Sequence, residues 1–527
     1  IVPTLHWIGK EKVINHHLDV PYKVLDYKYT YQSGGNTDNK QSENKIIHGD
    51  NLEALKSLLP QYEGRIDCIY IDPPYNTGNE SWVYNDNVND PKIKKWLGEV
   101  VGKEGEDLSR HDKWLCMMYP RLKLLQRLLS DTGAIFISID DNEQANLKLL
   151  CDEIFGAGNF VANLVWRSAD ASNNDAKQFS SDYNHTLIYS KKPNWEPERF
   201  ARTIENNMHY KNPDNDPNGA WFSGNVSSPN PRPNLRYSIA TPSGKEIESP
   251  VNGWRWSEER MLKMIDSGEV VFAEDETRII KKTYLKDQKG IVPSNIWWDI
   301  DVTGHNRNAK YELLKIFSEK HSSKVFKTPK PTKFIERILQ LFSKKTNAII
   351  LDSFAGSGTT AHAVLNLNKE DGGNRKFILI EMEDYAETIT AERVRRVIDG
   401  YGNTEGTGGN FTYYELGQPL LIDNKYINED VPLEILREYI FFTETRQVMP
   451  TFPDSAHPYL LGSYHMTDYY FYYEKNRVTT LDNSFLSTIT QSAENYLIYA
   501  DICTISDSEL LKHSITFKKI PRDITRL

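Results

Sequence analysis

The sequence predicts an α/β fold with a largely parallel sheet that two separated parts of the chain build together. Short apolar runs alternate with amphipathic stretches between residues 45 and 139, and the same alternation returns after residue 324. In between, from 161 to 323, the periodicity weakens and Asn, Pro, Gly and Trp become frequent. Because alternating strand and helix patterns indicate βαβ units, the two parts are expected to share one sheet around an inserted mixed domain.

The first part of the sheet is predicted from hydrophobic periodicity and from its end signals. Asp50 or Asn51 can cap a helix that carries leucines at helical spacing. Pro73 and Pro74 end the next strand, since proline cannot continue a hydrogen-bonded ladder. Strands are expected at 45–47, 66–71 and 134–139, with helices over 52–59 and 117–129 between them.

The second part repeats this order, and a different tail follows it. Helix, strand, helix and strand patterns lie at 329–342, 347–354, 358–368 and 376–382. The tail is rich in Tyr and ends in a strand-helix-strand pattern over 497–520. The expected domains are a first core part at 1–160, the insert at 161–323, a second core part at 324–417 and a small α/β C-terminal domain at 418–527.

Charge is distributed unevenly along the chain. The net charge is −10, yet Lys and Arg outnumber Asp and Glu by 6 between residues 160 and 345. A phosphate-contacting surface on an acidic scaffold fits this pattern, and an uneven spread of solvated charges is the alternative.

The cysteines and the apolar runs exclude other classes of protein. Cys68, Cys116, Cys151 and Cys503 are scattered, without a CxxC pair or a histidine at ligand spacing, so neither disulfides nor a metal site is expected. No apolar stretch is long enough to span a bilayer, and residues 1–13 lack the features of a signal peptide. A soluble cytoplasmic protein with no membrane partner is the expectation.

The first motif that carries chemistry is Asp72-Pro73-Pro74-Tyr75, which follows an apolar strand. An exocyclic amino group is a poor nucleophile because its lone pair is conjugated into the ring. The Asp72 carboxylate and the Pro73 carbonyl can each accept one N–H bond and favour a pyramidal nitrogen, while Pro74 helps to hold that carbonyl in place. Tyr75 offers a face on which a flipped base can stack. A tight turn at a strand end is the plain alternative.

The second motif is DSFAGSGTT, in which a strand leads into a glycine turn and a helix. No lysine follows the glycines as in a phosphate loop, and the dinucleotide fingerprint GxGxxG fails at Ala361. A cofactor with an amino acid at one end and a nucleoside at the other fits better, with Glu381 accepting the ribose hydroxyls. The candidate residues in the motif are Asp352, Phe354, Ala355, Gly356, Gly358 and Thr359.

Together the two motifs resemble those of DNA amino-methyltransferases. The order, with DPPY before FxGxG and a long insert between, is similar to the β class. The resemblance implies S-adenosylmethionine as cofactor and a circularly permuted Rossmann-like sheet. It also implies that the two motif strands are neighbours at the point where winding reverses, which is where ligands bind in open α/β sheets.

A longer resemblance extends along nearly the whole chain. DPPYNTG, HDKWLCMMYPRLKLLQRLLSDTGAIFISIDDNE and KTPKPTKFIERIL look like the modification subunit of type III restriction-modification systems. The resemblance implies adenine N6 as the target in double-stranded DNA, target recognition by the insert, a homodimer and a separate restriction subunit with helicase and nuclease activities. It places Lys330 near the methionine end of the cofactor and Asp50 near its adenine end, although Asp50 can equally be a helix cap and Lys330 a surface residue.

Three other functions remain open at this point. The first is an N4-cytosine methyltransferase, which would share the fold and the mechanism. Such enzymes more usually have serine at the position of Asp72, so Asp72 favours adenine without excluding cytosine. RNA or protein amides are substrates of related folds but give no use to a large basic insert. A non-catalytic DNA-recognition subunit would not need both motifs intact.

Overall fold

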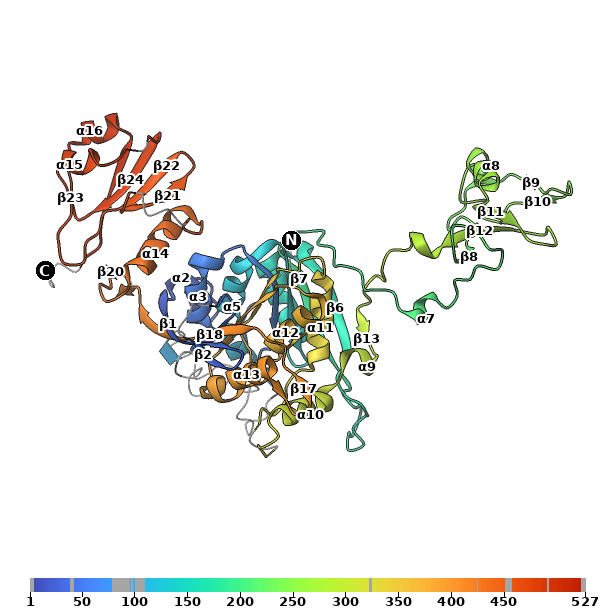
Figure 1. The fold of residues 1–527 in the computed structure, drawn as a ribbon, viewed down its shortest axis with the longest axis horizontal. Coiled ribbons are helices and arrows are strands. Elements are labelled where there is room, and N and C mark those ends of the chain that lie inside the picture. The colour runs from blue at the N-terminus through green and yellow to red at the C-terminus, as the bar shows by residue number, and fades with distance from the viewer. Residues whose placement is uncertain are drawn as a thin grey trace. The chain divides into compact units, whose positions relative to one another are not determined.

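The computed structural model describes residues 4–37, 42–77, 95, 98, 99, 110–321, 325–423, 425–450, 457–490 and 492–522. They form two compact units (Figure 1). Unit 1 combines Ile1–Pro197 with Ser294–Leu527, and unit 2 is Glu198–Pro293. No helix in the described ranges is long and apolar enough to cross a membrane.

A mixed sheet of 11 strands organises unit 1. Its order is β13 (Ile296–Trp297), β6 (Phe160–Arg167), β7 (Tyr183–Ser190), β5 (Leu129–Ile139), β4 (Ile66–Ile71), β14 (Ile349–Asp352), β15 (Lys376–Glu381), β3 (Lys45–His48), β18 (Asn410–Pro419), β1 (Lys23–Gln32) and β2 (Gly35–Thr37). The strands from β5 to β18 pair in parallel, while β7 is antiparallel to β5 and to β6, and β1 is antiparallel to β18 and to β2. The predicted α/β class and parallel centre are therefore confirmed, whereas the circular permutation stays a prediction.

The two motif strands are neighbours at the centre of this sheet. Ile350 and Leu351 of β14 pair with Cys68 and Ile69 of β4. From this pair the chain continues outward in opposite directions, from β4 to β5 on one side and from β14 to β15 on the other. This is a topological switch point, so the residues that follow β4 and β14 meet at one edge of the sheet.

Helices on both sides of the sheet bury the apolar stripes that the sequence predicts. Leu52, Leu55, Leu58 and Leu59 of α3 are all buried. The helices that bear on the site are α3 (Asn51–Tyr62), α5 (Arg110–Leu128), α6 (Gln144–Cys151), α11 (Thr332–Leu339), α12 (Thr359–Asp371) and α13 (Glu392–Asp399).

Unit 2 spans fewer residues than the insert that the sequence predicts at 161–323. It contains α8 (Glu258–Asp266) and a sheet of β11 (Val270–Phe272), β12 (Ile279–Tyr284) and β8 (Trp221–Gly224). Its two chain ends lie side by side, since Phe200 and Ile291 exchange backbone hydrogen bonds of 2.9 and 2.8 Å. On either side of unit 2, β6, β7 and β13 belong to the large sheet.

The tail has a sheet of its own within unit 1. Strands β21, β22, β24 and β26 lie in that order, and α14 packs against β21 and β22. The predicted strand-helix-strand pattern over 497–520 corresponds to β24, α16 and β26, and β24 pairs with β26 in parallel. The bounds are α14 (Leu433–Thr445), β21 (Leu460–Tyr464), β22 (Thr467–Phe471), β24 (Asn495–Ala500), α16 (Asp507–Lys512) and β26 (Ile515–Lys519).

Candidate active site

Asp72 leaves the end of β4 with its two carboxylate oxygens in different environments. Lys330 Nζ donates to Oδ2 at 2.6 Å. Oδ1 is buried and has no hydrogen-bond partner among the described residues. The same ammonium lies 5.0 Å from the centre of the Tyr75 ring. Lys330 therefore touches both the carboxylate and the aromatic face that the sequence assigns to the target base.

The two proline carbonyls of the motif also differ. The Trp114 indole, which is fully buried on α5, donates to the Pro74 carbonyl at 2.7 Å. The Pro73 carbonyl accepts no hydrogen bond from the part of the chain that the structure describes. Among the described residues, the Pro74 carbonyl thus has a partner and the Pro73 carbonyl has none.

A buried carboxylate holds the turn that follows the motif. Asn76 has a left-handed φ of 59°, a conformation that asparagine adopts more easily than most residues. Its side chain donates to Glu143 Oε1 at 2.5 Å, and His111 lies 2.7 Å from the same oxygen. Because Glu143 has no exposed surface, these contacts hold the turn that follows the motif.

The glycine loop begins at Asp352, at the end of β14. Its carboxylate accepts from the Phe354 backbone at 3.0 Å and from the Thr360 hydroxyl at 2.6 Å. Gly356 and Gly358 have φ of 52° and 80°, which glycine adopts without steric cost. The loop therefore turns sharply and presents its backbone toward the end of β15.

Glu381, at the end of β15, meets this loop. Its Oε2 accepts from the Gly356 N–H at 2.8 Å, and its Oε1 accepts from the Glu383 N–H at 2.9 Å. Burial raises the pKa of Glu381 to about 7, against the lowering effect of these two hydrogen bonds. Burial likewise raises the pKa of Asp352 to about 7. Two carboxyl groups that titrate near neutrality thus flank the glycine loop, an arrangement typical of ligand sites.

The remaining predicted residues lie around these two groups. The Thr359 hydroxyl donates to the Lys330 carbonyl at 3.3 Å, which joins the glycine loop to the Asp72 cluster. The Ala355 N–H donates to the Ile380 carbonyl at 3.1 Å. The Phe354 side chain packs against the main hydrophobic core.

Asp50 is a helix cap in this structure. Its Oδ1 accepts from the Leu52 and Glu53 backbones at 2.8 and 3.2 Å, and its Oδ2 lies 3.6 Å from the buried guanidinium of Arg121. The neighbouring Asn51 reaches the glycine loop, donating to the Ser353 carbonyl at 3.1 Å. A role of Asp50 toward a cofactor stays a prediction.

Arg393 is a residue at this site that the sequence reasoning did not identify. Its side chain is fully buried on α13, and Nη1 donates to the hydroxyls of Ser357 and Thr359 at 2.9 and 2.8 Å. Nη2 donates to Thr332 at 3.0 Å and to Glu312 at 3.2 Å. The sequence feature that could have identified Arg393 is its position within the apolar stripe of a helix, one turn before the buried Val397.

We expect Arg393→Met to weaken cofactor binding about tenfold and to lower the free energy of unfolding by roughly 3 kcal/mol, because it leaves Glu312 without its buried partner and frees the loop hydroxyls. Calorimetry and urea denaturation measure the two effects. Arg393→Lys should recover part of the affinity, since lysine keeps the charge but not the fork of donors. Equal affinity in all three proteins would contradict a role in positioning the loop.

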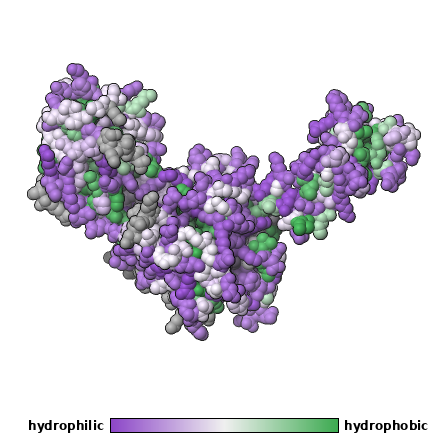
Figure 2. All heavy atoms as spheres, viewed as in Figure 1, coloured by the Kyte–Doolittle hydropathy of each residue, from purple (hydrophilic) through white to green (hydrophobic). Residues whose placement is uncertain are grey.

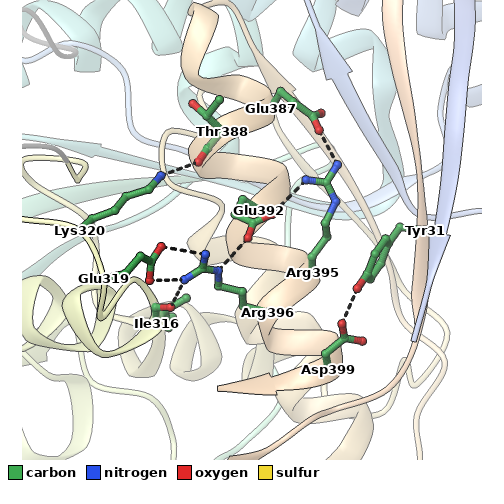
Figure 3. A network of polar contacts seen from close by, with 10 residues as sticks. All are labelled: Tyr31, Ile316, Glu319, Lys320, Glu387, Thr388, Glu392, Arg395, Arg396 and Asp399. Atoms are coloured by element: carbon green, nitrogen blue, oxygen red, sulfur yellow. Dashed lines mark hydrogen bonds and ion pairs between the residues drawn. The ribbon is translucent and has the colours of Figure 1, made fainter. Parts of the chain in front are cut away.

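The matched control is Arg396, about one turn further along α13 (Figure 3). Arg396 pairs there with Glu319 at 2.8 Å and with Glu392 at 2.8 Å, and its side chain is partly exposed. Arg395 pairs with Glu387 and Glu392 in the same network. Because partly exposed ion pairs contribute about 1 kcal/mol or less, Arg396→Gln should leave cofactor affinity unchanged.

Within the described residues, no group of three or more His, Cys, Asp or Glu side chains could hold a metal ion.

Comparison with known proteins identifies the family. A DNA methylase family model matches residues 66–392, which include both motifs, and the chain belongs to this family. It is 36% identical over 430 residues to the type III restriction-modification enzyme StyLTI Mod subunit of Salmonella typhimurium, a match that covers 78% of this chain and 62% of that one. The EcoP15I Mod subunit of Escherichia coli is 32% identical over 437 residues, covering 72% and 64%. The chain thus spans less than two thirds of the length of these relatives.

Among solved structures, two DNA methylases resemble the chain at low identity. A putative DNA modification methylase from Thermus thermophilus is 15% identical, covers 71% of this chain and 100% of its own, and has a TM-score of 0.33. The cytosine-N4-specific PvuII DNA methyltransferase is 13% identical, covers 67% and 87%, and has a TM-score of 0.35.

Proposed function

We propose that this chain is a site-specific DNA methyltransferase that transfers a methyl group from S-adenosylmethionine to N6 of a flipped adenine, as the modification subunit of a type III restriction-modification system. One observation carries the proposal: β4 and β14 are adjacent, so the Asp72 carboxylate and the glycine loop lie at the same edge of the sheet. Family membership and the similarity to Mod subunits support it.

In the proposed reaction, the target amino group takes the two free acceptors of the first motif. Asp72 Oδ1 accepts one N–H bond and the Pro73 carbonyl accepts the other, which localises the nitrogen lone pair toward the methyl donor. Tyr75 stacks on the extruded base. Lys330 now contacts both Asp72 and Tyr75, so it must move aside, or keep only its bond to Oδ2, when the base arrives.

The residues around the glycine loop fit S-adenosylmethionine. Glu381 is a buried carboxylate suited to ribose hydroxyls. An added Cβ at Gly356 would lie 3.0 Å from Phe326 Cζ, so this position has little room for a side chain. When bound, S-adenosylmethionine supplies the electrophilic methyl group. The proposed cofactor residues are Asp50, Lys330, Asp352, Phe354, Ala355, Gly356, Gly358, Thr359 and Glu381.

The proposed partners are double-stranded DNA, a second copy of the chain and a separate restriction subunit. The matched relatives are named as Mod subunits of type III enzymes, which supports the first and last of these. Target recognition is proposed for unit 2, because both chemical motifs lie outside Glu198–Pro293.

Sequencing of genomic DNA from a host that expresses this chain, with modified bases identified at single-nucleotide resolution, tests the function. We expect N6-methyladenine within one short recognition sequence. N4-methylcytosine would establish the cytosine alternative, and unmodified DNA would favour a non-catalytic recognition subunit.

Cofactor affinity should depend on pH through Glu381. The ionised carboxylate accepts ribose hydroxyls best, and its pKa is about 7, so protonation should weaken binding as the pH falls. We expect the dissociation constant to rise roughly tenfold between pH 8 and pH 6, measured by calorimetry. Glu381→Gln should bind weakly with a flatter profile, and the pH dependence that persists in it reports Asp352. An unchanged profile in the variant would show that Glu381 does not bind the cofactor.

A further inference from the structure

Exposed aromatic and basic side chains occur together near β13 and α10 (Asn306–Ile316). Trp298 is 50% exposed and Tyr311 is 57% exposed, although the visible face of the molecule is mostly hydrophilic (Figure 2). Large apolar side chains that gather on a surface indicate an interaction site, whereas isolated ones do not. We name this region the β13–α10 surface, and it comprises Arg167, Trp298, Arg307, Tyr311 and Lys315.

The sheet topology places this surface at the same edge as the catalytic motif. β6 is antiparallel to β7, and β7 is antiparallel to β5, so β6 runs in the direction of β5 and β4. β13 is parallel to β6. Arg167 ends β6 and Trp298 follows β13, so both lie toward the edge of the sheet at which Asp72 leaves β4.

Hydrogen bonds connect α10 to that edge. The Asn306 N–H donates to the Ser168 carbonyl at 3.0 Å, and Arg307 pairs with Asp170 at 2.7 Å. The Arg167 guanidinium lies 5.8 Å from the centre of the Trp298 ring. These contacts join the end of β6 to the start of α10 and to the residue that follows β13.

α10 presents a stripe in which an aromatic ring lies between two cations. Arg307, Tyr311 and Lys315 follow at spacings of four, so they project from one side of the helix. The opposite side is buried through Ala309, Leu313 and Ile316. Lys315 makes no ion pair within the described ranges, and its charge is available to a partner.

The surplus of basic residues between 160 and 345 lies in the segment 294–345 and not in unit 2. Unit 2 has 14 Lys and Arg residues and 14 Asp and Glu residues. Between residues 294 and 345 there are 11 Lys and Arg against 5 Asp and Glu. The excess predicted from the sequence between 160 and 345 therefore arises from the segment that contains α10, within unit 1.

We propose that the β13–α10 surface binds DNA beside the flipped adenine, with Arg307 and Lys315 on phosphates and with Trp298 and Tyr311 against unstacked bases. This inference rests on the proposed function and deepens it. Extrusion of a base leaves its partner and neighbours unstacked, and aromatic rings next to cations bind such bases without regard to sequence. Unit 2 would then read the sequence while unit 1 contributes a large share of the electrostatic affinity.

The double variant Tyr311→Ala/Lys315→Gln tests the proposal. We expect its affinity for a short duplex, measured by fluorescence anisotropy, to fall about tenfold from loss of one stacked base. The slope of log affinity against log salt should become less steep by about 0.9, the value for one lost phosphate contact. Cofactor affinity and thermal stability should not change, because both side chains are exposed.

A control variant can be made on β1, which lies near the opposite end of the large sheet from β13 and β6. Tyr27 and Lys28 on β1 are the same two residue types and are both 41% exposed, and Lys28 pairs with Glu415 at 2.9 Å. Tyr27→Ala/Lys28→Gln should bind DNA with the affinity and salt slope of the unmodified chain. If both double variants behave alike, or if the first one loses self-association in place of DNA affinity, the surface is not a DNA-binding site. Methylation by the unmodified chain, assayed in parallel, separates these results from a failure of the proposed function itself.

Discussion

Asp72→Ala should reduce methyl transfer about a hundred- to a thousandfold while cofactor affinity stays within a factor of two. The variant removes one of the two acceptors that hold the amino group, and preorganised groups of this kind commonly account for a hundred- to a thousandfold in rate. Single-turnover incorporation of labelled methyl groups into duplex DNA measures the rate, and calorimetry measures the affinity.

A second variant separates the acceptor role from the loss of the ion pair with Lys330. Lys330→Met removes the same 2.6 Å contact but leaves the carboxylate in place. If the contact with Lys330 were the only function of Asp72, both variants would lose the same activity. Measurable turnover by Asp72→Ala at the unmodified rate would exclude Asp72 from the catalytic residues.

Gly356→Val should raise the dissociation constant of S-adenosylmethionine about a hundredfold or more. Gly356 has φ 52°, a region in which a β-branched residue is strained, and a Cβ there would lie 3.0 Å from the Phe326 ring. The added side chain would push against the Phe326 ring and disturb the N–H that faces Glu381. Calorimetry with the folded variant gives the affinity directly.

Gly402→Val is the control for backbone strain. Gly402 has a similar φ of 55°, and a Cβ there would meet nothing within 4 Å. This variant should lose roughly 1–2 kcal/mol of stability from strain and keep its cofactor affinity. Equal loss of affinity in the two variants would mean that strain alone, and not the position of Gly356, determines the result.

Periodicity and end signals predicted the central strands and the glycine turn. The strand that Pro73 and Pro74 end is β4, and the predicted strands at 347–354 and 376–382 are β14 and β15. That β4 and β14 are adjacent is predicted from the family resemblance, because sequence spacing alone cannot pair strands that are so distant along the chain. The roles of Asp72, Gly356 and Glu381 stay predictions.

Other features depend on contacts that one sequence cannot reveal. From the sequence, the residues of β6 and β7 are assigned to the irregular insert. Their polar residues, Asn163 and Asn184 among them, obscure the alternation expected of strands. Trp114 meets the Pro74 carbonyl from 40 positions away, and Arg393 meets Thr332 from 61. Such partners become visible only when helices pack on the sheet.

The backbone bridge between Phe200 and Ile291 makes unit 2 modular. A segment that leaves and rejoins the core at one point can be lengthened, shortened or replaced without moving the strands on either side. The entropy of closing such a loop grows only with the logarithm of its length, so doubling the segment costs about 0.6 kcal/mol. Recombination between related genes at these two positions would therefore yield proteins that still fold, each with the same large sheet and a different unit 2.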